Sequence, residues 1–553
     1  MNGPIGAVTT YNKTLQIKKI DRSKRYGIVK GYHEHTKHYP HRYARSLGYM
    51  DWDNQPIPFR VFEGAPQIKL SLIQMDRDLP YSALYKCNEG SPDSISIDSV
   101  AIMLELSMGL SAWKKYKTSE WALRINPSSG NLHPTECYLV LPDFPHQPAC
   151  VTHYNPYLHI LEERARLNRS QAEWLNNCEG FGIILTSVTW REAWKYGERA
   201  FRYCHHDLGH ALGALRFACN LNGWKMMLMP NISEKTLNRF LGFDKLKYVG
   251  GEVEHADCLC WIDGNHDDPE EISKWISSRK DIEYEHHPNR LSLEHVDWEI
   301  IDMVQNASQI YNTVYPEISN KSKPTRNNLT SSFTAEGIIR RRRSAQNYDQ
   351  QASRTDLPAF IHTLKKTLPV EGCPFDVFPY EAQVHLAIFV HAVVGLESGL
   401  YMLVRNPKHF ELLKNLTHSS FDWHQVNEEL PFYILQTGDF RARAQSISCT
   451  QAIAGESAYS LGMLAHFDSV LMDDPSMYPR LFWETGLVGQ VLYLEAEAQD
   501  LRATGIGCFF DDEMHRILGL EGSEWQSLYH FTVGKHVDDI RLETKPPYFH
   551  LEQ

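Results

Sequence analysis

Two stretches of this chain match each other without a gap, and that internal repeat constrains the fold more than any other feature. Residues 207–209 (DLG) correspond to 484–486 (ETG), and 241–242 (LG) correspond to 518–519 (LG). Both pairs are 277 residues apart. One ancestral unit therefore occurs twice, and duplicated units joined in one chain commonly form a pseudo-twofold pair equivalent to a symmetric dimer.

Each copy lacks motifs that the other copy has. The first half contains a PSSGN turn at 127–131, for which the second half has no counterpart. The second half contains RRRRS at 340–344 and GIG at 505–507, which the first half lacks. This complementary distribution predicts one composite site per chain, built from both halves.

Length, composition and charge place the chain in a broad class. A chain of 553 residues with 42% apolar and 11% aromatic residues is typical of a globular protein with two or more domains. The net charge of −12 argues against general binding to nucleic acids or anionic membranes. The sequence shows no membrane-length apolar run and no signal-peptide core. Eleven scattered cysteines indicate reduced thiols, so we expect a cytoplasmic protein.

The hydrophobic patterns predict an α+β fold in four segments. Residues 1–95 are expected to form an N-terminal extension and 96–270 the first unit. Residues 271–335 form a connecting segment and linker, and 336–553 form the second unit. The linker chemistry is clearest at 316–335, which is rich in Ser, Asn, Thr and Lys.

Periodicity predicts strands and helices within these segments. We expect helices at 98–113, 199–222 and 481–501, and strands at 68–74, 137–141, 182–185, 258–262, 382–394 and 431–438. We interpret the strand at 431–438 (PFYILQTG) as the counterpart of 181–187 (FGIILTS).

Two of the motifs suit a ligand with a phosphate and hydroxyl groups. Guanidinium groups such as those at 340–344 bind phosphate bidentately, and the hydroxyl of Ser344 adds a hydrogen bond. The turn at 127–131 offers backbone donors and short hydroxyls to a polyhydroxylated chain or a ring edge. A solvated charge run and an ordinary turn before a strand are the alternative interpretations.

The GIG motif at 505–507 suits a planar ligand. Glycines let a ring lie close to the backbone and let an N–H point at it. The matching register in the first half ends in Pro230, which has no N–H. A plain turn is the alternative interpretation. The sequence contains neither GxGxxG nor GxxxxGK[ST], so dinucleotide-fold and P-loop interpretations lack motif support.

Lys195 and Tyr196 are candidate catalytic residues. A cationic neighbour lowers the pKa of a phenol, so we expect Tyr196 to exchange a proton at neutral pH. A surface lysine beside a packed tyrosine is the alternative interpretation. The histidines between 33 and 41, and those between 205 and 210, fit no standard zinc spacing, so we expect no metal site.

Taken together, these motifs resemble the nitroreductase superfamily of flavin enzymes, most of all its SagB/ThcOx-type azoline dehydrogenases. The resemblance covers about residues 100–265 and 336–545. It is carried by RINPSSGNLHPTECYLV, WKYGERAFRYCHHDLGH, RRRRSAQNY and ATGIGCFFDDEMHRILGL followed by YHFTVGK. It implies two nitroreductase-like α+β units fused as a pseudo-dimer, with FMN at their interface.

The resemblance also transfers flavin-binding roles residue by residue. The second half would hold the phosphate and ribityl chain and line the isoalloxazine ring, and the PSSGN turn would reach over from the first half. The implied flavin ligands are Arg342, Arg343, Ser344, Pro127, Ser128, Ser129, Asn131, Gly505, Ile506, Gly507 and Lys535, with Arg541 as an alternative to Lys535.

The implied catalytic pair is Lys195 and Tyr196. One of them would take a proton while the flavin takes a hydride from an azoline in a peptide, which gives an aromatic azole. The chain departs from the family pattern at Gln346, where arginine or lysine is common. Near the place expected for a second PSSGN turn it has FDVFPYEAQ at 375–383. We therefore expect one FMN per chain, with the second pseudo-symmetric site empty.

Two further functions stay open from the sequence. One is an NAD(P)H-dependent reductase of nitroaromatic compounds or quinones. The other is a catalytically inactive scaffold that binds a peptide or a partner protein. For azoline oxidation and for the NAD(P)H-dependent reductase, the expected partner is a small-molecule or peptide substrate. The internal pair already meets the family's dimer requirement, which is compatible with a monomer.

Overall fold

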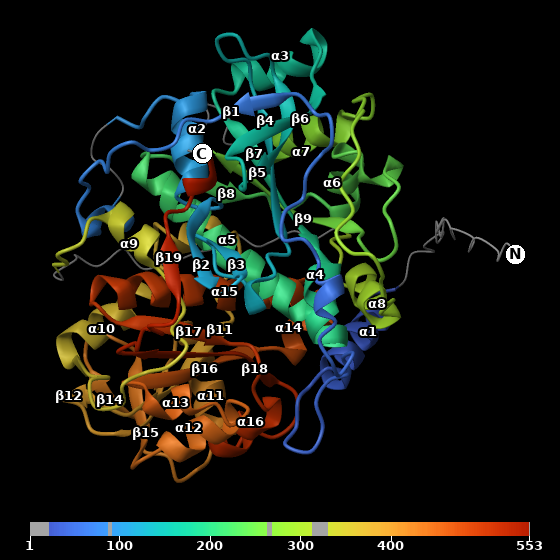
Figure 1. Ribbon diagram of the computed structural model, residues 1–553. Coiled ribbons are helices and arrows are strands. Elements are labelled where there is room, and N and C mark those ends of the chain that lie inside the picture. The colour runs from blue at the N-terminus through green and yellow to red at the C-terminus, as the bar shows by residue number, and fades with distance from the viewer. Residues whose placement is uncertain (1–20, 87–90, 263–267, 312–329, 552–553) are drawn as a thin grey trace, which may run out of the picture.

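The computed structural model describes residues 21–86, 91–262, 268–311 and 330–551. Figure 1 shows the first unit in blue to green and the second unit in orange to red, with two long helices between them. Most of the expected linker, 316–335, lies outside the described residues. No helix in the described part of the chain is long and apolar enough to cross a bilayer.

The first unit is built on a seven-stranded antiparallel sheet. In spatial order its strands are β1 (Gln67–Lys69), β6 (Ile160–Arg166), β5 (Cys150–Asn155), β4 (Thr135–Leu141), β7 (Phe181–Val188), β9 (Glu254–Ile262) and β8 (Met226–Leu228). The central strand β7 is buried along its whole length. Its residues alternate between two apolar clusters, with Ile183 in one and Ile184 in the other, so an unbroken apolar run is required.

The second unit repeats this sheet with the same strand arrangement. In spatial order its strands are β14 (His424–Asn427), β15 (Phe432–Thr437), β13 (Gly399–Leu403), β11 (Val384–Val390), β16 (Tyr459–His466), β18 (Trp525–Gly534) and β17 (Arg502–Ile506). A β-bulge interrupts β7–β9 at Leu185/Thr186, and another interrupts β16–β18 at Met463/Leu464. These bulges occupy equivalent positions, because β7 and β16 are both fifth in their sheets. The duplication is therefore present in the local backbone geometry.

The two units meet along α5 (Ala200–Leu221) and α15 (Met477–Ala498). Both helices are buried along their whole length, and one apolar core containing Leu208 and Leu487 runs through both units. The helices cross at Gly209 and Gly486. A Cβ added to Gly209 would lie 2.3 Å from the carbonyl oxygen of Trp483, and one added to Gly486 would lie 2.3 Å from that of His206. This reciprocal contact marks the pseudo-twofold axis.

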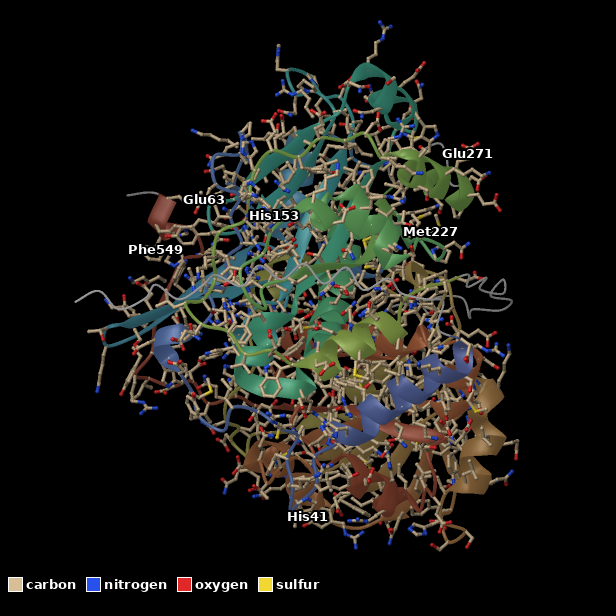
Figure 2. The ribbon with its side chains drawn as sticks, turned by 90° about the vertical axis from the view of Figure 1, so that its right-hand side faces the viewer. His41, Glu63, His153, Met227, Glu271 and Phe549 are labelled. Carbon is tan, nitrogen blue, oxygen red and sulfur yellow. The ribbon has the colours of Figure 1, made fainter. Side chains whose placement is uncertain are left out.

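The C-terminal segment of the chain returns to the first unit. A third sheet contains β19 (Glu543–Lys545), β2 (Leu110–Tyr116) and β3 (Ser119–Arg124), in that order. Phe549 lies against Trp113, and Figure 2 shows Phe549 on the same side of the molecule as Glu63 of the first unit. The second unit thus contributes a strand to a sheet of the first unit, and the contact between the units extends beyond the helical interface.

Several predicted elements differ from the structure. The expected helix at 98–113 is wrong in its second half. Helix α2 (Ile97–Glu105) ends early and the chain enters β2 after a tight turn, in which a Cβ added to Gly109 would lie 2.8 Å from the carbonyl oxygen of Glu105. The predicted strand at 68–74 shortens to β1, which joins the first sheet. The segment 1–95, expected to be an extension, therefore supplies an edge strand.

The proposed pairing of 431–438 with 181–187 is also wrong. Strand β15 lies second in its sheet, where β6 lies in the first unit, and it is only partly buried. The counterpart of β7 is β16. Both 181–187 and 431–438 carry apolar runs, and such runs do not reveal which position a strand takes in a sheet.

Candidate functional site

One cavity of about 1220 Å³ lies where the two units meet. Residues of the first unit and of the second unit both line its wall. The predicted flavin ligands Arg342, Arg343, Ser344, Pro127, Ser128, Ser129, Asn131, Gly505, Ile506, Gly507 and Lys535 all line it, together with Tyr196. Residues as far as 430 positions apart in the chain, Lys114 and Thr544, thus line the same cavity.

The pseudo-symmetric position holds a far smaller space. A pocket of about 10 Å³ is lined by Leu228, Met229 and Pro230, which match the register of the GIG motif, and by Arg480 and Trp483. That volume has room for about one water molecule. The two halves have therefore diverged from a common pair of positions into one open cavity and one filled position.

The PSSGN turn is fixed to the central helix. The N–H and the hydroxyl of Ser129 donate to the carboxylate of Asp207 on α5, over 3.0 Å and 2.9 Å. Gly130 and Asn131 both have positive φ, +62° and +60°, and the amide of Asn131 donates to the carbonyl of Ala122. The turn therefore places short polar groups at the cavity on a rigid base.

The ammonium group of Lys195 and the hydroxyl group of Tyr196 both lie against the same turn. A Cβ added to Gly130 would lie 2.7 Å from the hydroxyl of Tyr196 and 3.0 Å from Nζ of Lys195. Both residues come from the end of α4 (Thr189–Tyr196). Tyr196 lines the cavity, whereas Lys195 reaches it through contact with Gly130. Gly130 has no side chain, and this absence allows the approach.

The expected activation of Tyr196 is wrong. Burial raises the pKa of the Tyr196 phenol well above its ordinary value, and the nearby Glu192 and Tyr203 raise it further. Desolvation opposes the charged phenolate more strongly than the lysine supports it. The phenol therefore keeps its proton at neutral pH and is able to donate a hydrogen bond.

Two of the four arginines of RRRRS, Arg342 and Arg343, bind backbone carbonyls of the first unit. Arg342 Nε donates to the carbonyl of Ile125, and its terminal nitrogen donates to that of Arg124, over 3.0 Å and 2.9 Å. Arg343 donates to the carbonyl of Ser111 over 2.8 Å. Burial, followed by the charges of Arg342 and Arg502, lowers the pKa of Arg343 to about 9. These cations repel one another, so an anion bound here would relieve that repulsion.

The GIG segment differs from its predicted role at Gly505. The N–H of Gly505 donates to the hydroxyl of Tyr493 over 3.1 Å, and that hydroxyl also shares a 2.7 Å hydrogen bond with Ser344. This N–H therefore does not point at a ligand. A Cβ on Gly505 would lie 2.0 Å from the hydroxyl of Tyr529. Position 505 is therefore glycine because any side chain would clash with Tyr529.

The two candidate basic residues near the C-terminus are both in ion pairs. Lys535 lines the cavity, and its Nζ lies 2.7 Å from the carboxylate of Asp500. Arg541 pairs with Asp539 over 2.7 Å and is not among the lining residues of the cavity. Of the two, Lys535 is the one in position to contribute to an anion site.

Sequence reasoning missed Asp207 at this site and Glu192 on the neighbouring helix α4. Asp207 lines the cavity, and burial raises the pKa of its carboxyl to about 7, although hydrogen bonds from Ser128 and Ser129 oppose the shift. Burial also raises the pKa of the Glu192 carboxyl well above its ordinary value, and neither oxygen has a hydrogen-bond partner. In the sequence, Asp207 was recognisable only as part of the repeat that aligns 207–209 with 484–486. The sequence gave no sign of its contact with Ser129.

Metal binding finds no geometric support in the described residues. Within them, no group of three or more His, Cys, Asp or Glu side chains is arranged to hold a metal ion. His206 instead shares a hydrogen bond with Thr485 over 3.0 Å, and His210 with Tyr529 over 3.2 Å. These histidines contact the opposite unit across the helical interface.

Comparisons with known proteins agree with this architecture. A family model described as the nitroreductase family matches residues 431–535, inside the second unit. The crystal structure of a provisionally named nitroreductase from Anabaena variabilis covers 92% of this chain and 99% of its own, with a TM-score of 0.65 and 21% identity. At that identity the likeness shows the fold. No curated protein matches the chain.

Two other solved structures match about half of the chain. A provisionally named nitroreductase from Ralstonia eutropha covers 42% of this chain and 98% of its own, at 14% identity and a TM-score of 0.28. A chain of the E. coli microcin synthetase McbBCD complex with truncated pro-MccB17 bound covers 44% and 94%, at 15% identity and a TM-score of 0.25.

Proposed function

We propose that this chain is a nitroreductase-superfamily protein in which two units are fused, and that it is an FMN-dependent oxidoreductase with one flavin site. The carrying observation is the contrast between the two pseudo-symmetric positions. One is a cavity of about 1220 Å³ lined from both units, and the other has about 10 Å³. A cofactor-sized ligand fits only the first of these two positions.

The residues of the large cavity fit FMN in three ways. Arg342 and Arg343 crowd positive charge where a phosphate would sit, and like charges already lower the pKa of Arg343. The turn with Ser129 presents short polar groups to a hydroxylated chain. The ring would lie near Gly505 and Gly507, which both line the cavity. These are the residues that would hold the cofactor.

A bound flavin would supply a two-electron acceptor for a hydride from the substrate. The side chains of the protein would handle the proton. The Tyr196 phenol, which stays protonated, would donate a hydrogen bond to the substrate. Removal of the substrate proton would fall to Lys195 or to the carboxylate of Asp207, whose pKa of about 7 lets it exchange protons at neutral pH.

For the substrate we propose an azoline in a peptide, oxidised to an azole. The support is the resemblance of WKYGERAFRY to the azoline dehydrogenases, together with the contact that Lys195 and Tyr196 make with Gly130 at the cavity. Turnover of NAD(P)H with a quinone, without oxidation of thiazoline peptides, would instead identify the protein as a general reductase.

The first test is the flavin content of the purified protein. We expect a flavin absorption spectrum and about one FMN per chain after heat release. Arg342→Ala and Asn131→Ala, which alter opposite units, should each weaken FMN retention by about tenfold or more, because each removes polar contacts at the cavity. Arg541→Ala, outside the cavity, is the matched control and should retain FMN.

Two results would contradict the proposal. A colourless protein that takes up no FMN in excess would indicate the catalytically inactive scaffold. Two flavins per folded chain would contradict the single composite site. Thermal unfolding of each variant, measured in parallel, separates lost binding from lost folding.

A further inference from the structure

Two cysteines differ from the other eight in the described part of the chain. Those eight are buried, whereas Cys449 and Cys508 are partly exposed. The sulfur atoms of these two lie 2.7 Å apart. The accessible thiols are thus the ones that touch each other, although 59 residues separate them in the sequence.

The backbone holds this pair together from both sides. Cys449 lies between α12 (Arg441–Ile447) and α13 (Ala452–Glu456), and Cys508 lies just before α16 (Asp511–Leu518). The N–H of Phe510 donates to the carbonyl of Ile447 over 2.8 Å. The amide of Gln451 donates to the carbonyl of Cys508 over 3.1 Å. These two hydrogen bonds join the two segments that carry the cysteines. The short distance between the sulfur atoms is therefore supported by hydrogen bonds to the backbone.

The loop that carries Cys449 has an unusual backbone. Cys449 and Thr450 have φ of +51° and +61°, so two consecutive residues other than glycine are in the left-handed region. Such a conformation is costly for a β-branched residue such as Thr450, and it persists where the surrounding structure imposes it. The strained loop turns Cys449 toward Cys508.

The two thiols have different acid–base character. The hydrogen bond between the two thiols lowers the pKa of Cys508, and the charge of Arg199 lowers it further. The pKa of Cys449 is raised, first because of that same hydrogen bond. One thiol therefore favours the nucleophilic thiolate and its neighbour holds the proton, as in reactive cysteine pairs.

We propose that Cys449 and Cys508 form a redox-active dithiol–disulfide pair that exchanges two electrons with the flavin of the proposed function. Cys508 lines the same cavity as the predicted flavin ligands and directly follows Gly507. In this step the two S–H bonds break and one S–S bond forms. The two electrons and two protons pass to oxidised flavin, which becomes reduced flavin. The inference rests on the proposed function for its electron partner, but disulfide formation itself does not.

The first experiment measures the disulfide without using activity. The full-length protein is equilibrated in glutathione buffers of increasing oxidised fraction, alkylated and analysed by peptide mass spectrometry. We expect a linked peptide pair containing Cys449 and Cys508, and two of the eleven thiols lost. Cys178→Ser is the control, because its buried thiol donates only to the carbonyl of Trp174 and serine can keep that bond. Cys449→Ser and Cys508→Ser should give no link.

The proposal is overturned if both thiols remain fully alkylatable in excess oxidised glutathione, or if each forms only a mixed disulfide with glutathione.

The second experiment uses the flavin. Protein reduced with dithiothreitol and desalted is mixed with one equivalent of FMN without oxygen. Bleaching of flavin absorption should be about tenfold smaller in Cys449→Ser and in Cys508→Ser than in the wild type and in the control Cys178→Ser.

The outcomes separate this inference from the proposed function. Protein that binds FMN but forms no disulfide, or bleaches FMN equally in all variants, contradicts the inference alone. Protein that forms the disulfide but binds no FMN contradicts the proposed function, and with it the electron exchange. Thermal unfolding of each serine variant confirms that the fold is intact.

Discussion

At the scale of single residues, Asp207 is a group whose charge depends strongly on its surroundings. It is almost fully buried on α5, and it accepts hydrogen bonds from the backbone and the hydroxyl of Ser129. Burial raises the pKa of its carboxyl from 3.8 to about 7. The native state therefore keeps a proton that the unfolded chain has already lost.

This difference predicts how stability depends on pH. Between about pH 4 and pH 7 the native state binds the proton and the unfolded state does not, so stability falls as pH rises through this window. Asp207→Asn removes the titration. Its free energy of unfolding should rise relative to wild type by up to about 1.4 kcal/mol per pH unit across the window. Urea denaturation from pH 4.5 to pH 7.5 measures this, and a constant difference would contradict it.

Residue types were predictable from the sequence, but their partners were not. The arginines, the PSSGN turn and Tyr196 were identified from local motifs, and the structure brings them to one cavity. The bonds of Arg342 to backbone carbonyls of the other unit depend on tertiary packing. The raised pKa of Tyr196 likewise depends on Glu192 and on burial, which a Lys-Tyr pair in a sequence does not report.

At the scale of elements, the crossing of α5 and α15 depends on two glycines. Gly209 and Gly486 each lie against a backbone carbonyl of the opposite helix. Neither carbonyl can move away without shifting a helix. These positions were found in the sequence as repeat anchors, and the structure adds the physical reason that both are glycine.

We expect Gly486→Ala to destabilise the protein. The added methyl would lie 2.3 Å from the carbonyl oxygen of His206 and must push the helices apart. The free energy of unfolding should fall by about 1–3 kcal/mol. Gly31→Ala, in helix α1 (Arg22–His35), is the matched control because no atom lies within 4 Å of its added Cβ. That change should stabilise the protein by about 0.5–1 kcal/mol, and equal effects in denaturant titrations would contradict the packing argument.

Long buried elements were easier to predict than short ones. The helices expected at 199–222 and 481–501 correspond to α5 and α15 within a few residues, because apolar periodicity persists over many turns. The helix expected at 98–113 instead contains the junction of α2 and β2, and the turn between them depends on contact with Tyr548. A partner so distant in the chain leaves no trace in a local pattern.

At the scale of the whole molecule, the C-terminal segment joins the two units. Besides the β19–β2 pairing, the indole of Trp113 donates to the carbonyl of Pro547 over 2.9 Å. The N–H of Leu110 donates to the hydroxyl of Tyr548 over 3.0 Å, at a buried position. The duplication was predictable from spacing alone, whereas this exchange was not, because β19 is too short to show a pattern.

Tyr548→Phe tests this connection. The substitution keeps the buried ring but leaves the N–H of Leu110 without its acceptor, which should cost about 1–3 kcal/mol of stability. Tyr116→Phe, at the end of the same strand β2, is the control and should cost less than about 0.5 kcal/mol. Chemical denaturation of both variants measures the difference, and equal stability of the two would rule out a role for this hydrogen bond.

The peptide that links the two units also governs how the cavity responds to dilution. A site shared by separate subunits disappears when a dimer dissociates at low protein concentration. Here both walls of the cavity belong to one polypeptide, so they meet at an effective concentration that the linkage sets and that dilution does not change. The affinity of this cavity for its ligand should therefore be the same in a nanomolar solution as in a concentrated one.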